Sequence, residues 1–262
     1  MTDSTRKTIE VGDGAAIPTP EDRGLTAAWW TALCGTIFLL VLLPLVKPDP
    51  YAKIIRFVPD GILVTFEVTV ASISLALVIG LVTGLGRISK NYFFNLLASL
   101  YVEVVRGIPL LVQLFYIYFA LGHIVRVPDI VAAIIAMAVC YGAYMGEVFR
   151  AGIKAVDWGQ TEASLSLGFN QHQTMFYVIL PQAWRTILPP VGNEFIALLK
   201  DTSLVSILAV SDILRRGREY AAESFNYFET YTLIALIYLL ITLILSKLVS
   251  VMEHRLSHYE RR

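Results

Sequence analysis

The chain has 262 residues, of which 56% are hydrophobic and 16% charged, whereas a soluble domain carries about 25% charged residues. This shortage of charge indicates a protein that has membrane lipid as its solvent, and the chain is too short to add a soluble catalytic domain to a membrane domain. The formal net charge is zero, so no basic surface argues for nucleic acid as a partner.

The first segments are a polar tail and a long apolar run. Residues 1–26 are rich in Asp, Thr, Gly and Pro and predict a flexible tail. Residues 27–46 contain no charge and are long enough to cross a hydrocarbon core of about 30 Å. They predict a first membrane-spanning helix, and Trp29 and Trp30 at its start are typical of the membrane interface.

Further apolar runs predict five more spans, which makes the fold all-α. These runs cover about 61–86, 92–121, 127–149, 187–210 and 231–251. Pro109 removes a helical hydrogen bond and predicts a bend in the second of them. Glu103 and Arg106 are expected to pair on one helical face beside this bend, or Arg106 instead holds a substrate carboxylate. Glu147 and Arg150 are expected to form a second pair with the same spacing.

The loop cations predict the orientation of these spans. Lysine and arginine are in excess in the segments that share a side with the N-terminus, and such an excess marks the cytoplasmic side. The expected protein therefore crosses the membrane several times, with its N- and C-termini in the cytoplasm.

A polar stretch between the third and fourth of the later runs predicts a short exposed helix. Asp157, with Gln160 three residues later, is typical of a capping box at a helix start. Gly168 suits the left-handed position that ends a helix. The pattern predicts a helix over about 160–167, too short and too polar to span a membrane. On the cytoplasmic side such a helix can dock in a groove of a partner and transmit a rigid-body push.

This stretch resembles the EAA loop of ABC importer permeases. The matching residues are Glu162-Ala163-Ser164-x3-Gly168, followed by Ile179-Leu180-Pro181. Ser164 replaces the second Ala of the family pattern and Val178 its first Ile, and both changes are mild. Two further blocks, 105–110 and 189–203, are similar to the polar amino acid branch, the histidine/glutamine/arginine permease type.

The resemblance implies a fold and a division of labour between subunits. Residues 60–255 would form the five-helix core of a type I ABC importer permease, with a cytoplasmic coupling segment at 157–181. Residues 27–46 would be an extra N-terminal transmembrane helix, to which the resemblance gives no role. The chain would be the permease subunit of an ATP-driven importer for polar amino acids, in the bacterial cytoplasmic (inner) membrane, and not an enzyme.

The resemblance also implies partners. A separate ATPase dimer would use ATP and Mg, in agreement with the absence of a G-x-x-x-x-G-K-[ST] phosphate loop from the sequence. No cofactor is expected in this chain. A periplasmic or lipid-anchored binding protein would deliver the amino acid, and a second permease copy or a sister permease would complete the pathway. The residues expected to couple to the ATPase are Gln160, Glu162, Ala163, Ser164, Gly168 and Pro181.

Charged residues within the fourth later run, 187–210, are candidates for the substrate pathway, because charge inside a membrane is costly. Glu194 and Asp201 are seven residues apart and so point to one side of a helix. Together with Asn193 and Thr202 they are placed to line a cavity that attracts the ammonium group of an amino acid. The alternatives are a helix–helix hydrogen bond, an ion pair of Glu194 with Lys200 or Arg106, and an interfacial position for Asp201 beside Lys200.

Two other classes of membrane protein fit the sequence less well than a permease does. A self-sufficient secondary transporter or channel would show paired half-sequences with broken helices, which the sequence lacks. A membrane enzyme would need converging catalytic groups, and no such cluster stands out. The sequence does not choose among basic, acidic and amide amino acids as the substrate.

Overall fold

The computed structural model describes residues 21–124 and 127–257, and within these ranges it contains helices and no strand. The predicted all-α fold is therefore confirmed. The α-helices are α1 (Glu21–Val46), α2 (Pro48–Phe57), α3 (Pro59–Ile88), α4 (Tyr92–Gly107), α5 (Leu110–Ile124), α6 (Asp129–Lys154), α7 (Trp158–Ser166), α8 (Gln171–Gln173), α9 (Leu180–Asp201), α10 (Ile213–Ser224) and α11 (Tyr227–Ser257). A π-helix, η1 (Thr174–Ile179), precedes α9, and a 3₁₀-helix, η2 (Thr202–Leu208), follows it.

In the described ranges, four stretches are long and apolar enough to cross a membrane, and the α4–α5 pair makes a fifth if it counts as one span. The four are Ala27–Val46, Pro48–Ile88, Asp129–Lys154 and Tyr227–Leu256. The expected run at 187–210 becomes α9 followed by η2, and α9 carries too many polar residues to pass as a lipid-facing span. Helix α1 begins at Glu21 rather than 27, because the sequence from 21 to 43 contains no proline, and residues 1–20 of the expected tail lie outside the described residues.

The bend at Pro109 is confirmed, but it is much sharper than a kink within one helix. Helices α4 and α5 meet at 107°. Pro109 has no N–H to donate to the carbonyl oxygen of Val105. The side chain of Gln113 supplies the missing donor, since its Nε2 lies 2.7 Å from the carbonyl oxygens of both Val105 and Ile108. The expected span at 92–121 is therefore two helices.

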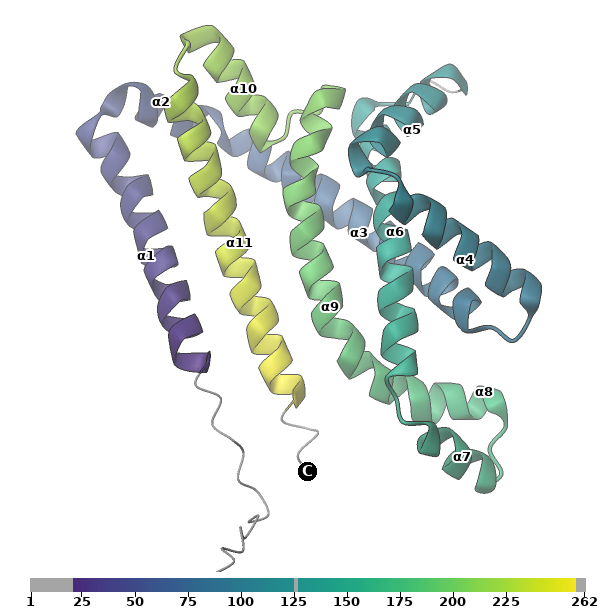
Figure 1. The fold of residues 1–262 in the computed structure, drawn as a ribbon. Coiled ribbons are helices and arrows are strands. Elements are labelled where there is room, and N and C mark those ends of the chain that lie inside the picture. Colours follow the sequence, from purple (N-terminus) through teal and green to yellow (C-terminus); the bar gives the residue numbers. More distant parts are fainter. Residues whose placement is uncertain (1–20, 125–126, 258–262) are drawn as a thin grey trace, which may run out of the picture.

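The elements sort into two ends of the molecule (Figure 1). One end contains the start of α1, the C-terminal end of α11, and the short helices α7 and α8. The other end contains α2 and α10. The first described residue and the C-terminal end of α11 are therefore on the same side as the short helix α7. The terminal residues 1–20 and 258–262 lie outside the described residues, so the cytoplasmic placing of both termini stays a prediction.

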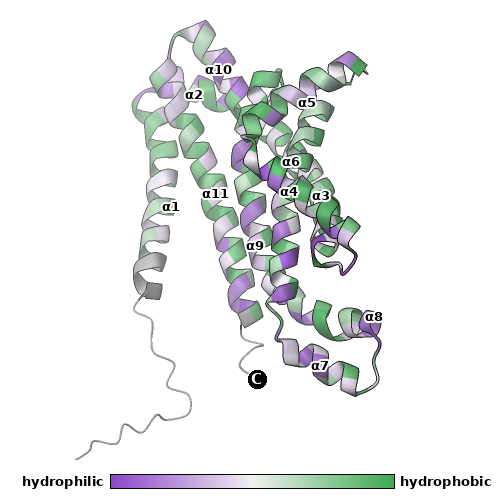
Figure 2. Ribbon diagram, turned by 45° about the vertical axis from the view of Figure 1, so that its right-hand side comes forward, coloured by the Kyte–Doolittle hydropathy of each residue, from purple (hydrophilic) through white to green (hydrophobic). Residues whose placement is uncertain are grey.

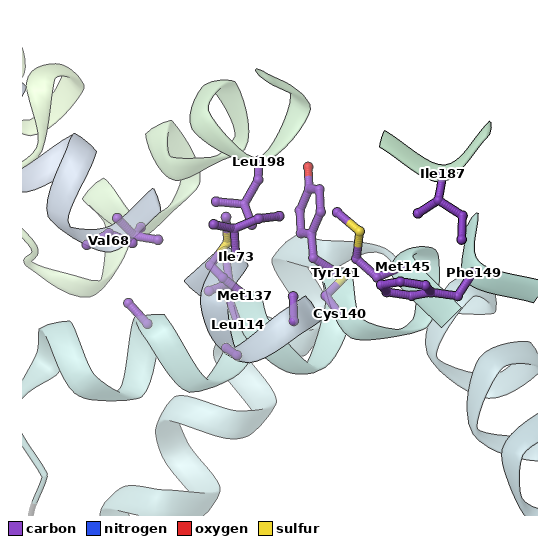
Figure 3. Close-up of a cluster of buried hydrophobic side chains, with 14 of the residues drawn as sticks. Val68, Ile73, Leu114, Met137, Cys140, Tyr141, Met145, Phe149, Ile187 and Leu198 are labelled. Carbon is purple, nitrogen blue, oxygen red and sulfur yellow. The ribbon is translucent and has the colours of Figure 1, made fainter. Parts of the chain in front are cut away.

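The centre of the fold is the contact between α3 and α6, which glycines bring close together. A Cβ added to Gly80 would lie 2.3 Å from the Cβ of Met145, and one added to Gly84 would lie 2.7 Å from the Cβ of Phe149. On α6, Gly142 and Gly146 pack equally close to α3. Small residues four apart let membrane helices approach in this way. Around this contact, buried side chains of several helices form one cluster, labelled in Figure 3 as Val68, Ile73, Leu114, Met137, Cys140, Tyr141, Met145, Phe149, Ile187 and Leu198.

A second cluster lies at the α2 and α10 end, where Tyr51, Ile54 and Val58 pack against α10 and α11. The extra helix α1 is fastened to α11 near both of its ends. The indole Nε1 of Trp29 donates to the carbonyl oxygen of Leu243 at 3.0 Å, and Lys247 lies 5.3 Å from the centre of the same ring. At the other end, Lys47 Nζ lies 2.8 Å from a carboxylate oxygen of Glu229.

Candidate functional site

The short helix α7 begins two residues earlier than expected, at Trp158, and ends one residue earlier, at Ser166. Asp157 is its N-cap, as expected, and its carboxylate accepts a hydrogen bond from the backbone N–H of Gly159 at 2.7 Å. Gln160 does not return a bond to Asp157, so the predicted capping box is wrong at this helix. The Gln160 side chain instead accepts from Gln182 Nε2 at 3.3 Å, because the start of α9 runs past α7.

Gly168 terminates helix α7, as the sequence predicts. Gly168 has φ of +89°, in the left-handed region, which costs a residue with a side chain about 1–2 kcal/mol. The N–H of Phe169 bonds to the carbonyl oxygen of Ser164 at 3.1 Å, and the N–H of Gly168 to that of Leu165 at 3.0 Å. These two bonds make a Schellman motif, so both ends of α7 are fixed by local hydrogen bonds.

Helix α7 is held to the rest of the chain from one side and is open on the other. Ser164 is buried, and its hydroxyl lies 3.1 Å from that of Thr174 in η1. The hydroxyl that departs from the family pattern therefore ties α7 to the segment leading into α9. Glu162 and Ala163 are exposed, and Trp158 Nε1 donates to a Glu162 carboxylate oxygen at 2.9 Å. Gln160, Gly168 and Pro181 are exposed as well.

The connection from α7 to α9 includes a π-helix. Asn170 and Gln173 form a reciprocal capping box at the start of α8, and the chain then continues helically through η1 into α9. π-helical turns are rare and occur frequently at functional sites. Pro181 lies in the first turn of α9, where its missing N–H is tolerated. Helix α8, η1 and α9 therefore form one continuous helical segment, and residues 167–170 connect it to α7.

Three helices contribute to a group of ion pairs near the α7 end of the molecule. Glu147 of α6 bonds to Arg150 Nε at 2.9 Å, as the spacing predicts, and to Arg87 of α3 at 2.5 Å. The predicted pair between Glu103 and Arg106 is wrong, because Arg87 lies 3.6 Å from Glu103. Glu147 therefore joins two arginines, one from each of the two most closely packed helices.

A second polar group, deeper in the fold, contains most of the pathway candidates. The guanidinium of Arg106 lies over the ring of Tyr144, 5.1 Å from its centre. Tyr141 lies 5.8 Å from Tyr144, centre to centre, and its hydroxyl donates to an Asp201 carboxylate oxygen at 2.8 Å. In Figure 3 the Tyr141 hydroxyl points away from the α6 ribbon. These contacts join α4, α6 and α9 in one polar array, and Glu194 lies about two helical turns before Asp201 on α9.

The remaining candidates divide between the surface and the core. Asn193 is exposed, Glu194 and Asp201 are half-buried, and Thr202 is fully buried. The Thr202 hydroxyl donates to the carbonyl oxygen of Leu199 at 2.6 Å. Within residues 21–124 and 127–257, no ion pair joins Lys200 to either carboxylate, so the structure does not show the alternative pairing of Glu194 with Lys200.

Tyr141 and Tyr144 are members of the polar array that sequence reasoning missed. They lie three residues apart on α6, a spacing that places both on one helical face. That spacing was available as a signal, but aromatic residues in apolar runs are more often packing residues. Their role became visible only when the fold brought Arg106 and Asp201 to the two rings.

Helix α9 presents a polar stripe on the outside of this single chain. Thr186, Pro190, Asn193 and Lys200 are exposed and follow one another at helical spacing. Figure 2 shows hydrophilic bands along α9, whereas α11 is mostly hydrophobic. The 22 residues of α9 extend about 33 Å, enough to cross a bilayer. A helix of this length with an exposed polar stripe is suited to line an aqueous path and not to face lipid.

Comparisons with known proteins agree with these features. A family model described as "Binding-protein-dependent transport system inner membrane component" matches residues 76–258. The chain is 37% identical over 200 residues to the Glutamine transport system permease protein GlnP of Escherichia coli (strain K12), which covers 75% of this chain and 91% of that protein. It is 35% identical over 204 residues to the Arginine transport system permease protein ArtQ of Bacillus subtilis (strain 168), covering 77% of this chain and 93% of that protein.

A solved structure gives the same result for the fold. The match is to the structure described as "Crystal structure of an amino acid ABC transporter with histidines", with a TM-score of 0.74 and 40% sequence identity, covering 78% of this chain and 96% of that one. Helix α2 and the part of α1 that spans the membrane precede the family match at residue 76. The chain therefore belongs to the binding-protein-dependent transport system inner membrane component family, as an ABC importer permease of the amino acid type.

Proposed function

We propose that the chain is the transmembrane permease subunit of an ATP-driven importer of polar amino acids in the bacterial cytoplasmic membrane, with both termini cytoplasmic. The names of the relatives, glutamine and arginine permease, support this substrate class. The observation that carries the proposal is α7. It is a short helix fixed at both ends, exposed on one side, and joined through η1 to the polar helix α9.

The exposed side of α7 is the surface offered to a separate ATPase dimer, which would bind ATP and Mg. Gln160, Glu162 and Ala163 lie on this surface. Because Asp157 and Gly168 fix the two ends, α7 can be pushed without unfolding. The push passes through η1 to α9 and changes which side of the membrane the polar stripe on α9 faces.

The polar array on α4, α6 and α9 is the proposed substrate contact. A zwitterionic amino acid carries both an ammonium and a carboxylate group. Glu194 and Asp201 would attract the ammonium group, and Arg106 would attract the carboxylate, since opposite charges interact strongly where water is scarce. The ring of Tyr144 holds Arg106 in reach of this space by a cation–π contact.

A second subunit is needed to enclose the path. The polar stripe on α9 is exposed in the single chain. Contact of Asn193 and Lys200 with lipid would be energetically costly. A second copy of this chain or a sister permease would cover the stripe. A periplasmic or lipid-anchored binding protein would deliver the amino acid at the end of the molecule where α2 and α10 lie.

Uptake of labelled amino acid into vesicles that contain the complete importer tests the coupling role. Glu162→Arg and Gly168→Val are expected to abolish ATP-driven uptake while the chain still inserts and purifies with normal yield. Glu253→Arg is the matched control, because Glu253 is also exposed near the same end but lies on α11. If uptake survives both changes in the EAA-like stretch, α7 does not couple transport to ATP.

Competition tests the substrate class in the same vesicles. Unlabelled glutamine, arginine, histidine and glutamate are compared with leucine and phenylalanine as competitors. Polar amino acids are expected to inhibit uptake and the apolar pair to leave it unchanged. Inhibition by the apolar pair alone would overturn the assignment.

A further inference from the structure

A cavity of about 790 Å³ lies between the ends of α3 and α6 and the inner side of α7. Its walls are largely apolar and include Ile88, Ile153 and Met175, with Lys90 and Lys154 among them. No step of the proposed transport mechanism uses this cavity. Its combination of an apolar interior and lysine side chains fits an amphipathic ligand.

The charge on the walls is positive and is only partly neutralised by the protein. Arg87 shares the carboxylates of Glu147 and Glu103. Within the described parts of the chain, neither Lys90 nor Lys154 has a carboxylate partner. Asp157 is the one acidic residue of the lining, and its carboxylate accepts the N–H of Gly159. Two unpaired ammonium groups therefore remain to attract an anion.

The aromatic residues beside Lys90 place the cavity at the level of the lipid headgroups. Tyr92, Phe93 and Phe94 begin α4 two residues after Lys90 and are 78%, 61% and 57% exposed. Exposed aromatic residues at a helix end are typical of the boundary between hydrocarbon and water. The candidate membrane span that includes α3 ends at Ile88, and Lys90 follows two residues later, as expected for a residue at the level of the phospholipid phosphates.

The cavity is separate from the surface proposed for the ATPase. Trp158, Thr161 and Leu165 are the α7 residues that line it, and their spacing of three and four places them on one helical face. Gln160 and Ala163 do not line it and belong to the remaining, exposed side. A ligand in the cavity and a protein on the outer side of α7 can therefore be bound together.

We propose that this cavity binds the headgroup of an anionic phospholipid, with Lys90 and Lys154 contacting its phosphate and its acyl chains lying along the exposed apolar residues of α3 and α4. Clusters of basic residues at the membrane surface attract anionic lipids by about 1 kcal/mol for each lysine. That energy is about fivefold in affinity for each side chain. A zwitterionic lipid gains none of this attraction.

Native mass spectrometry of the purified full-length chain in detergent tests the proposal, with phosphatidylglycerol and phosphatidylcholine of the same acyl chains as probes. The wild-type chain is expected to retain phosphatidylglycerol and to bind phosphatidylcholine much more weakly. Lys90→Gln/Lys154→Gln is expected to weaken phosphatidylglycerol binding about 30-fold. Lys90→Arg/Lys154→Arg keeps both charges and is expected to retain the lipid.

The control removes two charges from exposed residues at the opposite end of the chain, Lys53→Gln/Arg56→Gln, and is expected to bind as the wild type does. Equal binding of the two lipids, an unchanged Gln double variant, or an equal loss in this control would each overturn the proposal. In the complex with the ATPase subunit the lipid is expected to stay bound. Its displacement would assign the cavity to a protein interface and overturn the lipid site. The assay measures no transport, so its result is separate from the proposed function.

Discussion

Replacing Gly80 by alanine puts a methyl group where α3 and α6 leave no room for one. The new Cβ would lie 2.3 Å from the Cβ of Met145 and 2.9 Å from its backbone carbonyl carbon, whereas carbon atoms pack at about 3.5–4.0 Å. The two helices must separate by roughly 1 Å, and overpacking of this kind costs about 1–3 kcal/mol. The backbone of Met145 cannot rotate away from the new methyl group as a flexible side chain could. The upper value of this overpacking cost, about 3 kcal/mol, therefore applies. Alanine's higher helix propensity returns about 1 kcal/mol, which leaves a net loss of about 2 kcal/mol.

Thermal unfolding of the purified full-length chain in detergent, followed by circular dichroism, measures this loss. Gly80→Ala is expected to lower the unfolding midpoint by about 4–8 °C. Gly35→Ala is the matched control, because Gly35 also lies in a membrane-spanning helix and nothing lies within 4 Å of its added Cβ. That variant should unfold at or slightly above the wild-type midpoint. Equal midpoints for the two variants would refute the reasoning that Gly80 sets the separation of α3 and α6.

Three further predictions concern single side chains outside that contact. Burial raises the pKa of Asp212, the N-cap of α10, to about 6, so the free energy of unfolding should fall as pH rises from about 4 to 6 and stay low above that. Asp212→Asn should remove this pH dependence of stability and raise the thermal unfolding midpoint at pH 7.5 but not at pH 4. If the midpoints of the variant and the wild type change with pH in parallel, the prediction is contradicted. Gly168→Asn should retain more uptake than Gly168→Ala, because Asn tolerates a positive φ; equal uptake would exclude the backbone as the cause. Trp29→Phe should cost about 1 kcal/mol of unfolding free energy through the lost bond to Leu243, and an unchanged midpoint would show that the bond contributes nothing.

The parts of the fold that depend on near neighbours in sequence could be predicted. Length and hydropathy decide whether a run can cross a membrane, so residues 27–46 and the run within α11 were identified correctly. The pair of Glu147 and Arg150 and the left-handed turn at Gly168 also depend only on residues within one or two helical turns. The sequence alone was sufficient for these features.

Arg106 shows where local reasoning stops. Glu103 lies three residues away on the same helix, but Arg87 of α3 lies beside it, and Arg106 lies over Tyr144 of α6. Which partner an arginine takes depends on how three helices pack, and no spacing within α4 contains that information. The polar array could therefore be predicted as a set of candidates but not as a geometry.

Two features were missed although the sequence carried signals for them. No element was predicted where α2 lies, yet Tyr51, Ile54 and Val58, which are buried, have the three- and four-residue spacing of a helix face. The close contact of α3 with α6 was also missed. Gly80 and Gly84, four residues apart, have the small-residue spacing that marks such contacts.

The attachment of α1 to α11 determines what surrounds one side of α11 in the membrane. Boundary lipids normally exchange around a membrane helix, and their headgroups and chain lengths vary with growth conditions. Along one flank of α11, α1 takes their place and is attached through Trp29 and Lys47. That flank keeps the same neighbour in every membrane, and the second subunit proposed above would have to approach from another direction.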